Sequence, residues 1–206
     1  MAPYAHGPAS AGLVLAGGRS SRFGSDKAGA KLNGLTFLDI AARALKAGGR
    51  PVAVSAAIGS SAADLAAELG LPVLPDRLGD PAGPLSGVRA GLDWSRTIGA
   101  RSLAVRAIDT PLLPYEIHDQ LLAALIAVDA PAAFCVTLEG PQPLCSVWTP
   151  AVLPQLETAL VDGRHPAVHR FLADIGAVQL SVDLGAAFTN LNTEEDLRNA
   201  QSPGGN

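Results

Sequence analysis

The chain has 206 residues, of which 48% are hydrophobic and 17% are charged. This composition supplies enough apolar side chains for a buried core and excludes an intrinsically disordered protein, and the length predicts one domain or two at most. The net charge of −4 disfavours a protein that coats nucleic acid, because such proteins are normally basic.

The first half of the chain alternates short apolar runs with helical segments. Residues 12–15 are an apolar run followed by glycines, which predicts a buried strand. A helix is predicted at 36–47, with Thr36 as its N-cap and Gly48-Gly49 at its end. The next predicted elements are a strand at 52–55, a helix at 61–69 capped by Ser61, a strand at 71–74, a loop at 77–83 and a helix from Pro84 to about residue 94.

The second half of the chain continues this alternation as far as residue 128, and two adjacent strands are then predicted. A strand at 102–107 is followed by a helix at 114–128. Two strands, 133–138 and 144–148, flank a predicted turn at Gly140-Pro141, and they are expected to add an antiparallel element. The last predicted elements are helices at 150–161 and 167–176, a strand at 179–182 and a helix at 194–200 capped by Thr193.

This alternation predicts an α/β fold with three layers, Rossmann-like, in which a mainly parallel sheet is covered on both faces. One domain is expected over 12–201, between a flexible leader at 1–11 and a flexible tail at 202–206. The N-terminus lacks the features of a signal peptide, and no apolar run is long enough to span a membrane. With only two cysteines there is no disulfide framework, so a cytoplasmic protein is expected, with neither a membrane nor a nucleic acid as partner.

The segment after the first strand is expected to carry chemistry, because ligands of open α/β sheets bind beyond the carboxyl ends of the strands. Residues 15–27 read LAGGRSSRFGSDK. The glycines allow a ligand to approach main-chain N–H groups closely, and four basic side chains up to Lys31 outweigh Asp26. This pattern predicts a polyphosphate site, although it fits neither G-x-G-x-x-G nor the Walker A motif, and a purely structural turn remains the alternative.

The same segment resembles the signature loop of the nucleotidyltransferases. Its double glycine and its Asp-Lys pair most resemble the molybdenum cofactor guanylyltransferases, the MobA family. Four further motifs resemble that family in the right order: LPVLPD at 71–76, GPLSG at 83–87, DTP at 109–111 and NLNTEEDL at 190–197. The resemblance covers about residues 12 to 200 and implies that 12–201 is a nucleotidyltransferase domain.

The resemblance implies transfer of GMP from GTP to molybdopterin that carries molybdenum, with Mg²⁺ as cofactor. Molybdoenzymes or their chaperones are then further partners. In-line nucleotidyl transfer needs positioning and charge neutralisation rather than a protein nucleophile, which agrees with the lack of a nucleophile motif. The implied residues are Lys27, Asp109 and Arg22 for catalysis; Leu15, Ala16, Gly17, Gly18, Arg19, Lys27, Asp76, Gly83, Pro84 and Asp109 for GTP; Asp109 for the metal; and Asn190 and Asn192 on the acceptor side.

The sequence departs from the family pattern at several positions. Residues 55–58 read SAAI where the family has an Asn-Ala-Asn-like stretch, so side-chain amides expected near the base or ribose are missing. Ala107-Ile108 stands before Asp109 where Pro-Cys or a similar pair is frequent, and Phe23 stands where Met is usual. Small residues at Gly29-Ala30 replace larger aliphatic ones behind the loop.

Several of these residues also have simpler explanations. Asp76 and Asp109 could be ordinary loop or helix-start carboxylates, and Asn190 and Asn192 could shape a turn. His165 and His169 are four apart, but Pro166 between them disfavours a zinc site on one helix, and a surface or acceptor-side role is favoured. The residues expected to be core packing are Cys135, Cys145, Trp94 and Trp148.

Other functions remain open at this point. A molybdopterin cytidylyltransferase that uses CTP is the nearest alternative, and a sugar-1-phosphate nucleotidyltransferase is another. Cytidylyltransferases resemble Leu-Ala-Ala-Gly at the loop, and Gly17 in place of the second Ala makes room for a purine and favours GTP. The altered 55–58 stretch motivates an alternative of a different class, a nucleotide-binding regulator or an inactive relative. An NAD-dependent oxidoreductase is disfavoured because G-x-G-x-x-G is missing.

Overall fold

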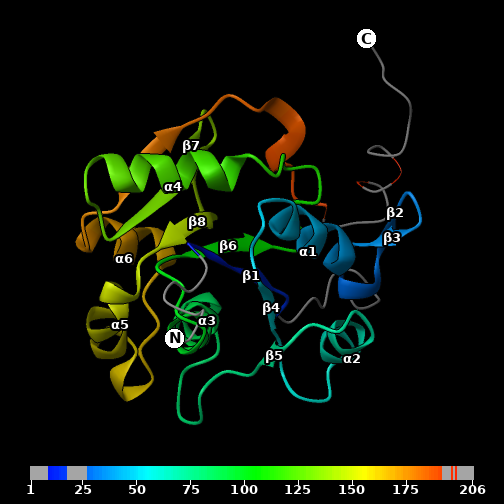
Figure 1. Ribbon diagram of the computed structural model, residues 1–206, viewed down its shortest axis with the longest axis horizontal. Helices are drawn as coiled ribbons and strands as arrows, with labels where there is room; N and C mark the ends of the chain where they lie inside the picture. Colours follow the sequence, from blue (N-terminus) through cyan, green and yellow to red (C-terminus); the bar gives the residue numbers. More distant parts are fainter. Residues whose placement is uncertain (1–8, 18–26, 192–195, 197, 199–206) are drawn as a thin grey trace, which may run out of the picture.

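Strands from both halves of the chain form one seven-stranded sheet (Figure 1). The computed structural model describes residues 9–17, 27–191, 196 and 198, and in it the strand order is β5-β4-β1-β6-β8-β7-β9. The central strand β1 is parallel to both of its neighbours, β4 and β6. The strands are β1 (Ala11–Leu15), β4 (Val52–Ser55), β5 (Val73–Leu74), β6 (Leu103–Ala107), β7 (Ala132–Thr137), β8 (Gly140–Trp148) and β9 (Val178–Ser181).

The expected mainly parallel sheet with a small antiparallel element is confirmed. Strand β8 is antiparallel to β6 and β7, whereas the pairs β4–β5 and β7–β9 are parallel. The predicted turn is displaced, however, because β8 already begins at Gly140 and Pro141 pairs with Val136. The hairpin turns at residues 138–139, two residues earlier than predicted, and Gly140 has φ +125°, a conformation that favours glycine.

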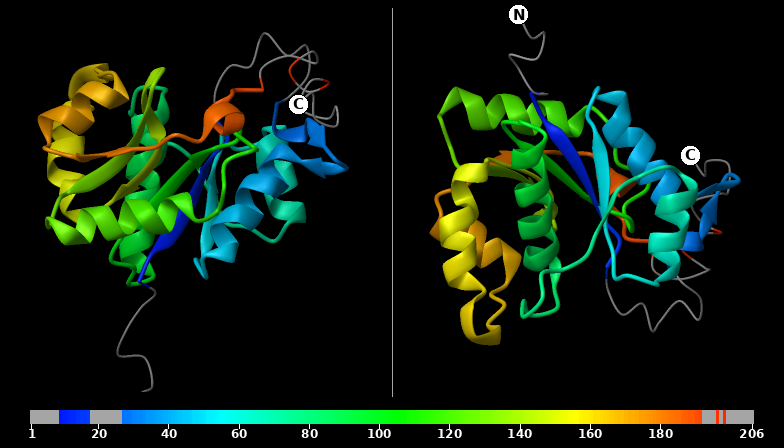
Figure 2. Two further views of the ribbon diagram at one scale, coloured as in Figure 1. Left: turned by 90° about the horizontal axis from the view of Figure 1, so that it is seen from above. Right: turned by 60° about the horizontal axis from the view of Figure 1, so that its bottom comes forward.

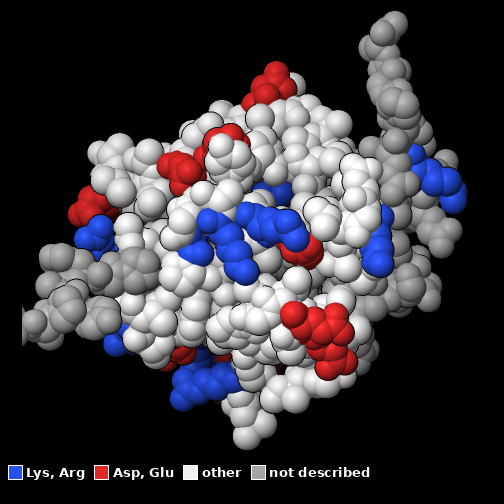
Figure 3. Space-filling view, turned by 45° about the vertical axis from the view of Figure 1, so that its right-hand side comes forward, with Lys and Arg blue, Asp and Glu red and all other residues white. Residues whose placement is uncertain are grey.

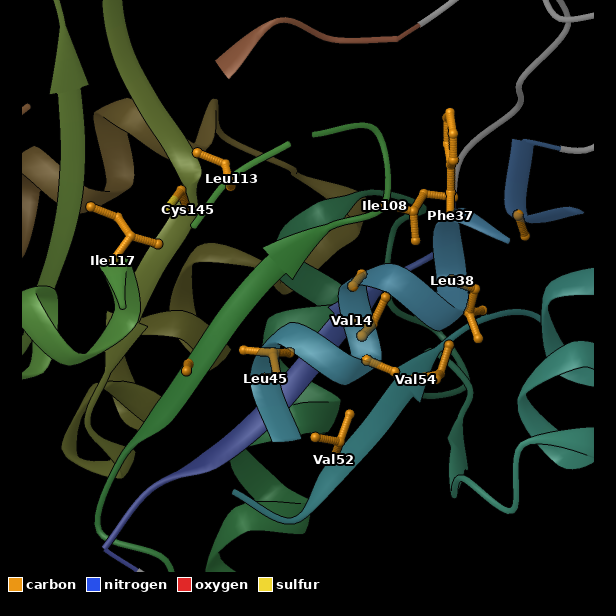
Figure 4. Packing of buried hydrophobic residues seen from close by; sticks show 14 of the residues in the cluster. Val14, Phe37, Leu38, Leu45, Val52, Val54, Ile108, Leu113, Ile117 and Cys145 are labelled. Carbon is orange, nitrogen blue, oxygen red and sulfur yellow. The ribbon is translucent and has the colours of Figure 1, made fainter. Parts of the chain in front are cut away.

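Helices cover both faces of the sheet, as the alternation predicts (Figure 2). Helices α1 (Phe37–Ala47), α2 (Ser61–Glu68) and α4 (Ile117–Ala127) pack on one face, and α3 (Pro84–Thr97), α5 (Leu153–Ala159) and α6 (Val168–Asp174) on the other. Because side chains alternate along β1, Val14 belongs to the first core and Leu13 and Leu15 to the second. Figure 4 shows the first core, where α1 lies over β1 and β4.

Helix ends follow the capping signals with two corrections. The Thr36 side chain accepts a hydrogen bond from the N–H of Asp39 at 3.1 Å, which confirms the predicted cap of α1. The cap of α2 is Ser60 rather than Ser61, because its hydroxyl accepts from the N–H of Ala63 at 3.2 Å. Helix α4 begins at Ile117 instead of 114, since the carbonyls of the preceding segment bind the side chain of Arg106.

Several short elements were not predicted. A hairpin of β2 (Lys31–Leu32) and β3 (Leu35–Thr36) turns at Asn33-Gly34, where both residues have positive φ. The chain also forms four described 3₁₀ turns: η1 (Lys27–Gly29), η2 (Pro150–Val152), η3 (Val161–Gly163) and η4 (Gly185–Phe188). The predicted helix at 150–161 is therefore divided into η2, α5 and the start of η3.

Parts of the chain lie outside the described residues. They include most of the predicted leader, the tail and most of the predicted last helix, so these remain predictions. Among the helices of the described part, none is long and apolar enough to cross a membrane.

The close packing of α3 on the sheet depends on a glycine, and we expect Gly91→Ala to destabilise the fold. A Cβ at Gly91 would come within 2.7 Å of Leu13 Cδ2 and 2.9 Å of Leu103 Cδ2, and both leucines are fully buried. Overpacking costs about 1–3 kcal/mol and the gain in helix propensity offsets about 1 kcal/mol, so the net loss should reach up to about 2 kcal/mol in urea unfolding.

Gly29→Ala is the matched control for this prediction. A Cβ at Gly29 would meet only Leu65 Cδ1, at 3.9 Å, so this variant should unfold within about 0.5 kcal/mol of the wild type. Equal stability of the two variants would contradict the packing argument.

Candidate functional site

The carboxyl ends of β1, β4 and β6 meet at one edge of the sheet. The N–H of Ala16 donates to the Ser55 carbonyl at 3.0 Å, and the N–H of Ile108 donates to the Leu15 carbonyl at 3.3 Å. These bonds fix Leu15 and Ala16, which were predicted to hold the nucleotide. Gly17 follows and is exposed, and a Cβ built there would meet no atom of the described residues within 4 Å. The main chain at Gly17 is therefore accessible to a ligand.

Lys27 and Asp109, the two residues expected to act on phosphate and metal, lie together at this edge. Lys27 Nζ is 3.4 Å from Asp109 Oδ2, although the residues are 82 positions apart in sequence. Their side chains are 15% and 29% exposed. Such partial burial makes the attraction stronger than in a fully solvated surface pair. The site thus holds one cation and one anion at a fixed separation, with both still reachable from solvent.

A cavity of about 220 Å³ opens beside Asp109. Asn190 lies on it, and the neighbouring N–H of Leu191 donates to the Asp109 carbonyl at 2.9 Å. The structure therefore brings the predicted acceptor-side Asn190 to the predicted metal ligand. The sequence did not identify the rest of the wall, which is lined by Ala107, Thr110, Leu113, Gln142, Pro143, Leu144, Cys145 and Phe188.

Asp76 lies in the loop after β5 and has a different environment. Partial loss of hydration raises the pKa of Asp76; the negative charge of Asp80 raises it further, and the nearby His165 acts in the opposite direction. Asp80 itself is buried and accepts from Arg89 at 2.6 Å. The hydroxyl of Ser86 donates to the Pro81 carbonyl at 2.6 Å. These two bonds attach the loop to α3 and so hold Asp76 at the sheet edge.

The first turn of α3, which carries Gly83 and Pro84, is in contact with a histidine. His165 Nε2 accepts the N–H of Leu85 at 3.1 Å, and a Cβ at Gly83 would come within 2.3 Å of the same nitrogen. Gly83 also has φ +157°. This hydrogen bond gives His165 a structural partner and favours helix capping over zinc binding, while His169 is exposed.

The departure at 55–58 has a structural counterpart. Ser55 is only 5% exposed, and a Cβ at Gly87 would lie 2.4 Å from its hydroxyl oxygen. The Ser55 side chain is thus packed closely against α3.

The residues expected to be core packing are confirmed as such. Cys135 and Cys145 are buried free cysteines with their sulfur atoms 3.6 Å apart. Trp148 is fully buried, stacks on Phe171 with ring centroids 6.1 Å apart, and donates to Ser146. Trp94 is partly buried against the same core.

Four of the predicted site residues lie outside the described residues: Gly18, Arg19, Arg22 and Asn192. Their roles remain predictions. Figure 3 shows basic side chains gathered near the centre of one face with acidic ones beside them, so the described surface in that view is of mixed charge although the chain is acidic.

A buried histidine joins α4 to β6. His118 is fully buried on α4, and its Nε2 lies 3.0 Å from the Val105 carbonyl oxygen. Burial, followed by the positive charge of Arg106, lowers the pKa of His118 to about 3. The imidazole is therefore neutral at neutral pH and donates from Nε2.

Comparison with known proteins shows which family this chain resembles. The family model described as MobA-like NTP transferase domain matches residues 12–178. The chain is 37% identical over 195 residues to a molybdenum cofactor guanylyltransferase of Rhodobacter capsulatus. The match covers 93% of this chain and 94% of the relative. It is 38% identical over 192 residues to a molybdenum cofactor guanylyltransferase of Cereibacter sphaeroides, with 93% and 95% covered.

Solved structures agree on the fold. The molybdopterin-guanine dinucleotide biosynthesis protein A of Archaeoglobus fulgidus superimposes with a TM-score of 0.75 at 22% identity, over 92% of this chain and 96% of that one. At this identity the likeness concerns the fold alone.

The neutral state of His118 predicts an acid sensitivity of the fold. The unfolded chain binds a proton at the ordinary pKa of about 6.5, whereas the folded protein does so only near pH 3. The stability due to His118 is therefore present above about pH 6.5 and is lost as the pH falls. Between about pH 7.5 and pH 5 the loss should be about 2 kcal/mol in urea unfolding.

His118→Gln isolates this contribution, because glutamine keeps an N–H donor and does not titrate. The variant should lose about 2 kcal/mol less than the wild type over the same pH interval. The same pH dependence in both proteins would show that His118 is not held neutral.

Proposed function

The chain belongs to the MobA-like NTP transferase family, and from that premise we propose that it transfers GMP from GTP to molybdopterin bearing molybdenum. The products are molybdopterin guanine dinucleotide and pyrophosphate. The observation that carries the proposal is the pair formed by Lys27 on η1 and Asp109 after β6, beside a cavity that Asn190 lines. Two polyanions must meet in this reaction, and the pair lies where nucleotide and acceptor sides adjoin.

The reaction is an in-line substitution at phosphorus. An oxygen of the acceptor's terminal phosphate attacks the α-phosphorus of GTP, the bond to the bridging oxygen breaks, and pyrophosphate leaves with the electron pair. The protein contributes positioning and charge neutralisation. In this proposal the main chain at Leu15, Ala16 and Gly17 holds the nucleoside, and the Lys27 ammonium faces the phosphates.

The remaining residues carried over from the family complete the proposed site. Asp76 contacts the guanosine, and the first turn of α3 shapes its pocket. The other members are Gly18, Arg19 and Arg22 with the phosphates, Gly83 and Pro84 at α3, and Asn190 and Asn192 on the acceptor side.

A divalent cation fits the donor set at Asp109. Mg²⁺ prefers oxygen ligands, usually one or two carboxylates together with phosphates and waters. Asp109 offers a partly exposed carboxylate, and Asn190 on the same cavity offers an amide oxygen. Mg²⁺ would supply neutralisation of phosphate charge when bound. Lys27 holds the Asp109 carboxylate in place through its hydrogen bond to Oδ2.

Nucleotide selectivity is the first test. Purified protein with Mg²⁺ and molybdopterin, with GTP or CTP, should form the guanine dinucleotide in preference to the cytosine one, because the exposed main chain at Gly17 leaves room for a purine. The products are separated by chromatography. A preference for CTP would overturn the guanylyl assignment, and binding of GTP without any product would favour an inactive relative.

Asp109→Ala tests the assignment of the metal ligand. Loss of this carboxylate should lower the transfer rate at least about 100-fold, since the developing phosphate charge loses its cation. The fold should persist, because removal of a partly exposed pair costs about 1 kcal/mol.

Asp93→Ala is the control for the loss of one carboxylate. Asp93 is exposed on α3, and its substitution should leave transfer unchanged. An Asp109→Ala variant as active as Asp93→Ala would place the metal elsewhere.

A further inference from the structure

A buried arginine of β6 binds the segment that follows Asp109. Arg106 is 0% exposed and lies three positions before Asp109 in the chain. Its Nη2 donates to the carbonyl oxygens of Thr110 at 3.0 Å and Leu113 at 2.8 Å. Longer contacts reach the carbonyls of Pro111 at 3.4 Å and Pro114 at 3.5 Å. One guanidinium thus gathers four main-chain oxygens of a single short segment.

These contacts add to the single main-chain bond within the segment, from the N–H of Leu113 to the Thr110 carbonyl at 3.4 Å. Pro111 and Pro114 have no N–H to donate, and residues 110–116 lie between β6 and α4 outside any helix or strand. Four carbonyls pointing to one place would repel one another without a cation between them. The planar guanidinium with its five N–H donors matches such a set, whereas an ammonium offers a single point.

The cation remains charged in its buried position. Burial lowers the pKa of Arg106 to about 10, so the guanidinium is protonated at neutral pH. Burying a charge is costly unless it is paired or fully hydrogen-bonded. The four carbonyl oxygens provide much of this compensation through Nη1 and Nη2, whereas Nε is buried without a hydrogen-bond partner among the described residues. The segment and the arginine therefore stabilise each other.

The segment held in this way carries the chemistry. Asp109 contacts Lys27, and Asp109, Thr110 and Leu113 line the cavity beside it. Figure 4 shows Leu113 near Ile117 of α4 and Cys145 of β8, which anchors the far side of the segment in the core. A shift of the segment would therefore move the carboxylate and the cavity wall together.

We propose that Arg106 is a positioning residue, which fixes the Asp109 segment through its carbonyl oxygens and so sets the place of the carboxylate and of the acceptor cavity wall. The role assigned to Asp109 rests on the proposed function. A purely structural arginine would stabilise the protein without affecting how Asp109 meets a cation. The two roles differ in metal affinity and in the local dynamics of the segment.

The test uses Arg106→Lys, which keeps the charge and lacks the planar fork of donors. Arg50→Lys is the matched control, because Arg50 is a buried arginine whose guanidinium pairs instead with Asp119. Binding of Mn²⁺ to each protein with GTP is followed by electron paramagnetic resonance, without turnover. Hydrogen exchange of peptides covering 107–117 is measured by mass spectrometry on the same proteins without metal.

We expect Arg106→Lys to weaken Mn²⁺ binding about 10-fold or more, as loss of groups that orient a metal ligand commonly does. Exchange in 107–117 should accelerate at least about 10-fold while other peptides keep their rates. Arg50→Lys should stay within about twofold in both measurements.

Three outcomes would overturn the proposal: unchanged Mn²⁺ binding in Arg106→Lys, equal effects of the two lysine variants, or failure of Arg106→Lys alone to fold, which would mark a structural role. A wild-type protein that binds no Mn²⁺ with GTP would instead contradict the proposed function. The exchange comparison would then decide whether Arg106 holds the segment.

Discussion

The pairing of β1 with β6 is the constraint on which the site depends. The two strands are parallel, with Ala11 paired to Leu103 and Leu15 paired to Ala107, so both strands end at the same edge of the sheet. Lys27 begins η1 and Asp109 follows β6, and their charged groups lie 3.4 Å apart. Neither residue has to be buried as an isolated charge, because each neutralises the other. A shift in strand register would separate them.

Two buried arginines hold the loops on either side of this pair, and they do so by different means. Arg89 on α3 binds the carboxylate of Asp80 and thereby attaches the loop that carries Asp76. Arg106 on β6 binds only main-chain oxygens and thereby shapes the segment that carries Asp109. A carboxylate partner fixes one point of a loop, whereas several carbonyls define the course of a whole segment. The loop that carries Asp76 and the segment that carries Asp109 are therefore stabilised independently.

The sequence predicted the fold wherever local signals and periodicity agreed. Thr36 and Pro84 marked helix starts correctly, because capping and φ restriction act within one turn of the chain. The turn at Asn33-Gly34 carried the strongest local hairpin signal and was missed, since its strands have only two residues each. The start of α4 could not be predicted, because it depends on a side chain from another element.

For the site, as for the fold, local sequence patterns predicted some residues, and residues that act through tertiary contacts were not predicted. Motif positions indicated Lys27, Asp109 and Asn190, and the structure brings these three to one edge. No local pattern identifies Arg106, since its partners are main-chain oxygens that any residue offers, or the contact of His165 with Leu85, which joins residues 80 positions apart. Residues that hold a reactive side chain in place act through tertiary contacts. A sequence motif therefore names the groups that meet the substrate and leaves out the groups that hold them.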